Sequence, residues 1–221
     1  MHVRIAVLAS GRGSNLGALI DAQRGGNLPV HIVGVFSDKP SAPALALARE
    51  SNIPTAHLDP RDFAQRLAFD LAAFATIAKW KPELIVLAGF MRILDPRAFE
   101  PWLGRIINIH PSLLPKYPGL HTHRRVLAAG DRQHGASVHF VTAELDGGPV
   151  LAQVMVDVRR GDTEQGLAER LLPREHALIV ACVDQLARHR LHWSNEGIRM
   201  DGQPLACPLV LADDGTLGTR A

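Results

Sequence analysis

The sequence VRIAVLASGRGSN, residues 3–15, decides the fold, because a short apolar run leads directly into a turn of glycine and serine. The run favours a β-strand, and residues 16–22 after the turn are typical of a helix. A helix that follows such a turn presents unpaired backbone N–H groups and the positive end of its dipole, which together bind anions. The stretch therefore predicts a phosphate-binding loop, in which Ser14 and Asn15 add side-chain hydrogen bonds.

The same loop fits a dinucleotide site only in part. Gly11 and Gly13 match the start of the dinucleotide fingerprint, but Leu16 stands where its third glycine belongs. Asp38 follows the next predicted strand, where an acid that binds ribose is expected, yet it also suits a turn. The loop therefore favours phosphate over a nicotinamide cofactor, and a tight turn without any ligand stays open.

Strands and helices alternate through the first half of the chain. The predicted strands are 30–36, 55–58, 83–88 and 105–109, and the predicted helices are 42–50, with Ser41 as its N-cap, and 61–79. Residues 83–88 are nearly all apolar, as expected of a strand buried on both faces of a parallel sheet. The pattern predicts an α/β fold with a Rossmann-like sheet, parallel in the N-terminal half, and helices on both faces.

The pattern changes after residue 110. Residues 111–123 are rich in proline and predict a loop, and the alternating runs 137–141 and 150–158 predict an antiparallel extension of the sheet. Residues 163–188 predict a long helix, broken or bent near Pro173, and 189–200 a closing hairpin. We predict one domain over residues 1–200, with a phosphate-binding half over about 1–100 and a catalytic half over about 101–200. A loosely ordered tail is expected over 201–221.

Composition excludes several classes of protein. The 221 residues carry 24 Lys and Arg against 22 Asp and Glu, a net charge of +2 that gives no electrostatic footprint for nucleic acid. No apolar run approaches the roughly 18 residues that a membrane span needs. Two cysteines, Cys182 and Cys207, form neither a disulfide framework nor a metal-binding pair, which favours the cytoplasm.

Asn108 and His110 lie at the C-terminal end of a predicted strand, two residues apart, so their side chains point to one side. Open α/β sheets bind ligands at this end of their strands. Asp146 lies in a glycine-rich turn from which it could reach them, and a carboxylate beside an imidazole raises the pKa of the imidazole. An amide and an imidazolium suit the oxyanion of acyl transfer, although ordinary loop chemistry would explain the same residues.

Longer segments resemble a known family. Residues 108–119, NIHPSLLPKYPG, resemble the signature of formyltransferases that use 10-formyltetrahydrofolate. The segments SGRGSNL (10–16), LAGFMRIL (87–94), GLHTH (119–123), HGASVHFV (134–141) and ELDGGP (144–149) resemble the phosphoribosylglycinamide formyltransferase family in particular. The similarity runs in order from the first strand to about residue 200. It implies formyl transfer from 10-formyltetrahydrofolate to the amine of phosphoribosylglycinamide in purine synthesis.

The resemblance also implies roles for single residues. It makes Asn108, His110 and Asp146 catalytic, so that alanine at each should remove most activity and leave the fold intact. It assigns the substrate phosphate to Gly13, Ser14 and Asn15, and a contact with the glycinamide substrate to Glu175. It assigns the folate pocket to Arg66, Met91, Arg92, Ile93, Leu94 and Asn108, with the pterin near residues 142–146. Arg61 is a rival to Arg66, and Leu172-Pro173 departs from the family's more polar helix, which puts further phosphate contacts there in doubt.

The resemblance implies a cytoplasmic monomer or homodimer whose partners are two small molecules. It implies no metal, no nucleic acid and no membrane. His121 and His123 could be drawn with His110 and His139 as a zinc site, but a loop over the substrates is preferred. A methionyl-tRNA formyltransferase would carry a further RNA-binding domain, and a formyltetrahydrofolate hydrolase an N-terminal regulatory domain. A nucleotide-binding module without catalysis, or a nicotinamide oxidoreductase, is a further alternative.

Overall fold

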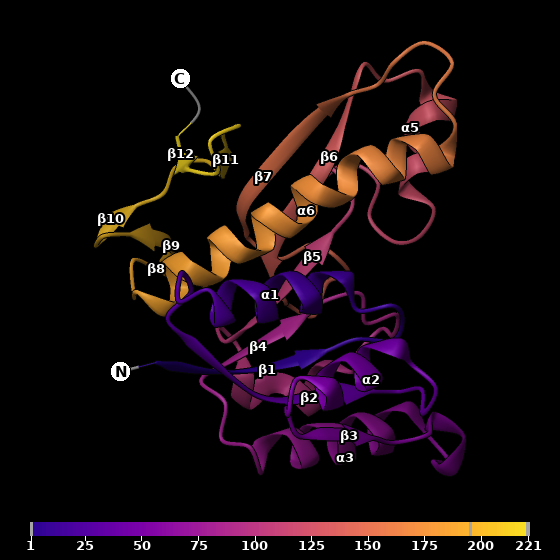
Figure 1. The fold of residues 1–221 in the computed structure, drawn as a ribbon, viewed down its shortest axis with the longest axis vertical. Coiled ribbons are helices and arrows are strands. Elements are labelled where there is room, and N and C mark those ends of the chain that lie inside the picture. Colours follow the sequence, from indigo (N-terminus) through magenta and orange to yellow (C-terminus); the bar gives the residue numbers. More distant parts are fainter. Residues whose placement is uncertain (1, 195, 220–221) are drawn as a thin grey trace. The chain divides into compact units, whose positions relative to one another are not determined.

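The structure is a computed structural model that describes residues 2–194 and 196–219. The chain divides into two compact units, residues 1–108 and 109–221, which are described separately. Figure 1 draws the first unit in indigo to magenta and the second in pink to yellow. The predicted α/β class is confirmed, with parallel strands in the first unit and an antiparallel pair in the second.

The first unit is built on parallel strands in the order β3-β2-β1-β4-β5. Their bounds are β1 Val3–Leu8, β2 Val30–Ser37, β3 Thr55–His57, β4 Leu84–Leu87 and β5 Ile106–His110, which runs on into the second unit. The register pairs Leu8 with Leu87 and Leu87 with Asn108, so three strands end level with one another. The strand order also reverses at β1, because β2 lies on one side of it and β4 on the other. Open α/β sheets bind ligands at such a reversal point.

Helices cover this sheet. They are α1 Ser14–Arg24, α2 Pro43–Glu50, α3 Arg66–Ala78 and the single turn α4 Pro96–Phe99, with 3-10 turns η1 Pro60–Asp62 and η2 Glu100–Trp102. Ile5, Ala6 and Val7 of β1 have no exposed surface, and all four residues of β4 are buried. The core strands are thus covered on both faces, as their apolar runs predicted.

The second unit contains the antiparallel pair β6 Gln133–Phe140 and β7 Val150–Asp157. The long helix α6 Glu164–Ala187 lies along this pair, and the short helix α5 Thr122–Ala129 contacts α6 (Figure 1). Strand β11 Leu209–Leu211 adds to β7 in parallel, and β12 Leu217–Gly218 pairs with β11. A separate small sheet joins β8 Leu191–Ser194, β9 Gly197–Met200 and β10 Gln203–Pro204.

Several predicted boundaries were wrong. Helix α3 begins at Arg66 and not at Arg61, because Asp59 accepts a hydrogen bond from the Arg61 backbone and closes a separate 3-10 turn. Helix α2 has Ala42 as its N-cap and not Ser41. Helix α6 runs unbroken through Pro173, because its buried face, Leu171 and Leu178 included, packs against β6 and β7.

Two further segments are more ordered than predicted. Helix α5 begins inside the expected loop, and β6 begins four residues before the expected strand. The described part of the tail forms strands, of which β11 pairs with β7 and is held by Arg174, whose guanidinium donates to the carbonyls of Leu211 and Ala212. No helix in residues 2–194 and 196–219 combines the length and apolar character needed to cross a bilayer.

Candidate functional site

The turn between β1 and α1 has the geometry of an anion site. Gly13, at φ 77°, is the N-cap of α1, and the first helical hydrogen bond runs from Gly17 N to Gly13 O. The N–H groups of the preceding residues of the first turn therefore have no partner within the helix. Asn15 is 8% exposed, and its Oδ1 has no hydrogen-bond partner among the described residues. A ligand with both anionic and hydroxyl groups suits these donors and this acceptor.

Gly13 is the glycine of this loop that the backbone requires. A Cβ there would lie 2.8 Å from Ala44 Cβ, and its positive φ disfavours any other residue. At Gly11 a Cβ would meet no described atom within 4 Å. We expect Gly13→Ala to lower the free energy of unfolding by about 1–3 kcal/mol and Gly11→Ala to leave it nearly unchanged, as measured by urea denaturation. Equal effects of the two substitutions would show that the left-handed turn is not needed.

Ser10 connects this loop to the residues that follow β4. Its hydroxyl donates to Asp38 Oδ1 at 2.5 Å and accepts from Met91 N at 2.9 Å, while its own N–H donates to Gly89 O at 3.0 Å. Asp38 is thus a buried structural partner of Ser10 and is directed at the loop. Sequence reasoning considered Asp38 as a ribose-binding or turn residue but did not identify Ser10. The only sequence signal for Ser10 is its position just after β1.

The strip of residues 91–94 presents apolar side chains to solvent. Met91 is 66% exposed and Ile93 55%, which is unusual for large apolar residues beside a buried strand and typical of a ligand surface. The Arg92 guanidinium lies 4.5 Å above the ring of Phe69, and its buried Nε has no hydrogen-bond partner among the described residues. Leu94 is half-buried.

Asp95 ends this strip. It caps α4, accepts two hydrogen bonds from the Arg97 side chain, and lies 3.8 Å from Arg66. The hydrogen bond from Arg97 lowers the pKa of Asp95 to about 2. The rival Arg61 instead forms a close ion pair with Asp59 at 2.6 Å. The structure therefore places Arg66, and not Arg61, next to an end of the strip.

In the second unit, two histidines flank Asp146. His110 Nδ1 lies 3.4 Å from Asp146 Oδ2, and His139 Nε2 lies 3.7 Å from Asp146 Oδ1. All three side chains are at most 10% exposed. Asp146 has φ 51°, a left-handed conformation, and its Oδ2 also accepts a hydrogen bond from Gly119 N at 2.8 Å. Asn108 precedes His110 by two residues in β5 and is half-buried.

The other ring nitrogen of each histidine faces a backbone carbonyl. His110 Nε2 lies 2.9 Å from Tyr117 O, and His139 Nδ1 lies 2.9 Å from Phe140 O. Sequence reasoning set His139 aside and did not identify Tyr117 or Gly119. His139 alternates with the apolar Val138 and Phe140, which suggests a solvent-facing side chain, yet it is buried because it contacts Asp146.

Burial lowers the pKa of His110, and it outweighs the hydrogen bond to Tyr117 O and the charge of Asp146, which both act to raise it. The ligand-free site therefore favours the neutral imidazole more than an exposed histidine would. Burial acts to raise the pKa of Asp146, but hydrogen bonds from His139 and Gly119 N outweigh it, so its pKa lies below the usual value. The site therefore holds a carboxylate beside a histidine that is ready to accept a proton.

Glu175 lies on the buried face of α6, with 9% of its surface exposed. In the same unit, His123 Nδ1 and His134 Nε2 lie 2.8 Å apart, in edge-to-face rings. Within the described ranges, no three His, Cys, Asp or Glu side chains gather as they would around a metal ion.

His134 makes folding depend on pH. Burial, together with His123, lowers its pKa from 6.5 to about 4 in the folded chain. The unfolded chain binds the proton first as pH falls, so the free energy of unfolding should decrease between about pH 6.5 and 4. We expect His134→Gln to reduce this decrease by up to about 3 kcal/mol, measured by urea denaturation across that range. The exposed His192, changed to Gln, is the matched control, and equal slopes in all three proteins would contradict the prediction.

Comparison with known proteins gives consistent matches. Residues 3–183 match the family described as Formyl transferase. The phosphoribosylglycinamide formyltransferase of Escherichia coli (strain K12) is 45% identical over 212 residues, which are 96% of this chain and 100% of that protein. The one from Mycobacterium tuberculosis is 44% identical over 84% of this chain and 86% of its own. The solved structure of the Coxiella burnetii phosphoribosylglycinamide formyltransferase superposes with a TM-score of 0.88 at 43% identity, covering 93% and 97%.

Proposed function

Because the chain belongs to the phosphoribosylglycinamide formyltransferases of the formyl transferase family, we propose that its own reaction is theirs. It transfers the formyl group of 10-formyltetrahydrofolate to the amine of phosphoribosylglycinamide, a step of purine synthesis. The observation that carries this assignment is the buried His110–Asp146 pair, whose histidine lies two residues after Asn108 in β5.

In the proposed reaction the substrate amine attacks the formyl carbon. A bond forms between the amine nitrogen and this carbon, and the carbonyl electrons move to its oxygen. The Asn108 amide donates a hydrogen bond to this oxyanion, a type of contact that is typically worth about 10²–10³ in turnover. Asn108 needs no change of protonation for this task, because its amide is a donor at every working pH.

The attacking amine becomes positively charged and must lose a proton. We assign this proton to the His110–Asp146 pair, because neutral His110 lies beside an ionised carboxylate. The imidazolium that forms stabilises the oxyanion, and Asp146 in turn stabilises the imidazolium. When the bond to the folate N10 breaks, the proton passes to N10, so the products are the formamide and tetrahydrofolate. Neither residue ends the cycle with a changed charge.

The proposed phosphate and folate contacts lie in the first unit, and the proposed glycinamide contact lies in the second. We assign the ribose phosphate to the loop of Gly13, Ser14 and Asn15, and the folate to the strip of residues 91–94 with Arg66. The supporting observations are the helix N-terminus, the exposed apolar side chains of the strip and the position of Arg66 beside Asp95. Glu175, a buried acid on α6, suits a cationic or hydrogen-bond-donating part of the glycinamide. Further phosphate contacts from Leu172-Pro173 are not part of the proposal.

The proposal includes a cytoplasmic protein that acts on two small molecules as a monomer or homodimer. Its two cysteines suit a reducing compartment, because Cys182 is buried, where burial raises the pKa of its thiol, and Cys207 is exposed and free.

One assay tests the reaction. The protein is mixed with 10-formyltetrahydrofolate, with and without phosphoribosylglycinamide, and folate absorbance is followed. We expect a change only when the amine is present. A change without it would indicate a formyltetrahydrofolate hydrolase, transfer only to methionyl-tRNA would indicate that formyltransferase, and no change with either would indicate a binding module.

A further inference from the structure

The carbonyl of Tyr117 determines which nitrogen of His110 can exchange a proton. His110 Nε2 lies 2.9 Å from Tyr117 O, and a carbonyl oxygen only accepts hydrogen bonds. Nε2 therefore carries the hydrogen in the neutral imidazole, and Nδ1 has the lone pair. Nδ1 is also the nitrogen that lies 3.4 Å from Asp146 Oδ2. The atom that gains and loses the proton is thus Nδ1, on the side of the carboxylate.

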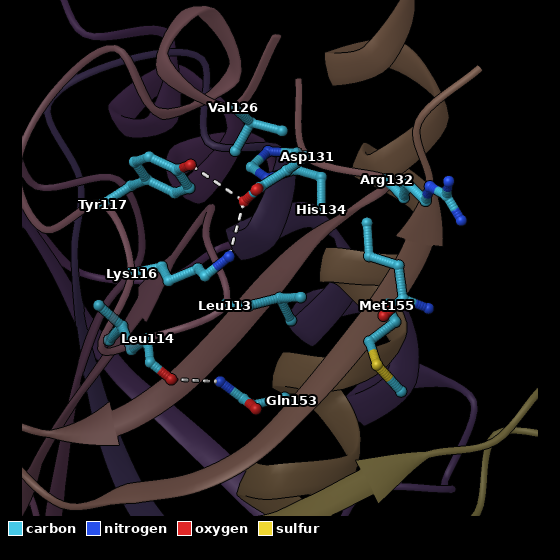
Figure 2. Close-up of a pocket in the computed structure, with 11 residues that line it drawn as sticks. Leu113, Leu114, Lys116, Tyr117, Val126, Asp131, Arg132, His134, Gln153 and Met155 are labelled. Carbon is cyan, nitrogen blue, oxygen red and sulfur yellow. Dashed lines mark hydrogen bonds and ion pairs between the residues drawn. The ribbon is translucent and has the colours of Figure 1, made fainter. Parts of the chain in front are cut away.

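Tyr117 is in turn held by a group of three side chains, which we name the Asp131 clasp: Lys116, Tyr117 and Asp131. The Tyr117 hydroxyl donates to Asp131 Oδ2 at 3.0 Å, and Lys116 Nζ donates to the same oxygen at 2.9 Å. Figure 2 shows both side chains converging on Asp131 from one segment of loop. Tyr117 has φ 57°, a left-handed conformation that a tyrosine keeps only when its surroundings impose it.

Packing alone does not hold this loop. A cavity of about 430 Å³ lies beside it, bounded by Leu113, Leu114 and the clasp on one side and by His134, Gln153 and Met155 of the strands on another (Figure 2). Because fewer atoms pack against the segment on this side, its polar contacts contribute to its position. These contacts include the clasp, the hydrogen bond from Gln153 to Leu114 O at 2.9 Å, and those from Ser112 to Lys116 O at 2.6 Å and from Arg125 to Pro118 O at 2.5 Å.

On the basis of the formyl transfer proposed above, we propose that Asp131 is a positioning residue for that reaction. Through the Tyr117 hydroxyl it holds the Tyr117 carbonyl against His110 Nε2, and it thereby keeps Nδ1 directed at Asp146. A ligating or reacting histidine commonly has its second nitrogen fixed in this way by a backbone carbonyl. Asp131 itself touches neither His110 nor the reacting atoms.

Other charged groups also influence His110. Asp146 raises its pKa, while His139 and Arg125 lower it, and His134 lies close enough for His110 to lower the pKa of His134. Arg125 also lies 5.1 Å from the centre of the Tyr117 ring and donates to Pro118 O. None of these four groups belongs to the clasp, and Tyr117→Phe removes no charge. A change in the His110 titration of that variant would therefore report the Tyr117 carbonyl.

The test compares Asp131→Ala, Tyr117→Phe and Asp131→Asn with Asp184→Ala. The control removes a carboxylate of similar exposure that pairs with Arg188 on α6. The ¹⁵N and ¹³C signals of the His110 imidazole are followed by NMR as a function of pH, together with kcat and KM. The NMR readout needs no substrate, so it decides the positioning role even if the proposed reaction fails.

We expect Asp131→Ala and Tyr117→Phe to lower the His110 titration midpoint by about 0.5–1 pH unit, because a hydrogen bond favouring the cation is weakened. Both should show mixed tautomers at high pH and a kcat about 3–10-fold lower, with KM within about twofold. Asp131→Asn, which still accepts from Tyr117, should restore the single tautomer. The proposal is overturned if Tyr117→Phe leaves both the titration midpoint and the tautomer of His110 unchanged. This result decides the question even if Asp131→Ala fails to fold.

Discussion

Asp146→Asn is expected to lower turnover by about 10²–10⁴ while the protein stays folded. The amide has the same shape and still accepts the hydrogen bond from Gly119 N, but it carries no charge to stabilise protonated His110. Asparagine also tolerates the left-handed backbone at this position, φ 51°, better than alanine. Initial rates with both substrates saturating, beside thermal unfolding of the same samples, measure the effect.

The pKa of Asp146 also predicts how its contribution to turnover depends on pH. Asp146 has a pKa below its usual value, so its carboxylate persists in mildly acidic solution and is lost only as pH falls through the lowered pKa. An Asp146→Asn enzyme that turned over within about threefold of the parent would show that the carboxylate is structural. Its contacts with two histidines would then serve only to hold the turn of residues 144–149.

His110→Ala is expected to lower turnover by a similar factor, about 10²–10⁴, with little change in KM. In the proposed mechanism the imidazole receives the proton of the attacking amine and returns it to the leaving nitrogen, so its loss should affect the transition state more than substrate binding. The exposed His192, changed to Ala, is the matched control.

The two substitutions should not be additive. If His110 and Asp146 act as one proton-exchanging pair, as proposed, the double variant His110→Ala with Asp146→Asn should be about as slow as the slower single variant. Losses that multiply in the double variant would mean that the residues act independently, and near-normal turnover of His110→Ala would remove it from the mechanism.

Local sequence patterns predicted the first unit well, because its signals are local. Apolar runs gave β1 and β4, the glycine turn gave the start of α1, and the spacing of Asn108 and His110 put both at the end of one strand. The resemblance to a family supplied the role of Asp146, whereas spacing left open whether it reaches His110, 36 positions earlier in the chain.

What the sequence could not supply depends on burial and long-range contacts. Asp146 was expected to raise the pKa of His110, and it does, but the desolvation that outweighs it is visible only in the folded chain. The burial of His139 and its contact with Asp146 are likewise visible only in the folded chain. Helix α5 gave no signal, since it begins at a left-handed His121 with no side-chain cap in the described structure. The role of Tyr117 lies in its backbone carbonyl, which no residue type reveals.

The most direct test of formyl transfer by the His110–Asp146 pair follows the formyl carbon itself. The protein is incubated with phosphoribosylglycinamide and 10-formyltetrahydrofolate labelled with ¹³C in the formyl group, and the labelled product is identified by NMR. The label should appear as a formamide on the former amine, at a rate that His110→Ala and Asp146→Asn each lower by about 10²–10⁴. Label released as free formate, or a formamide formed as fast by either variant as by the parent protein, would contradict the account.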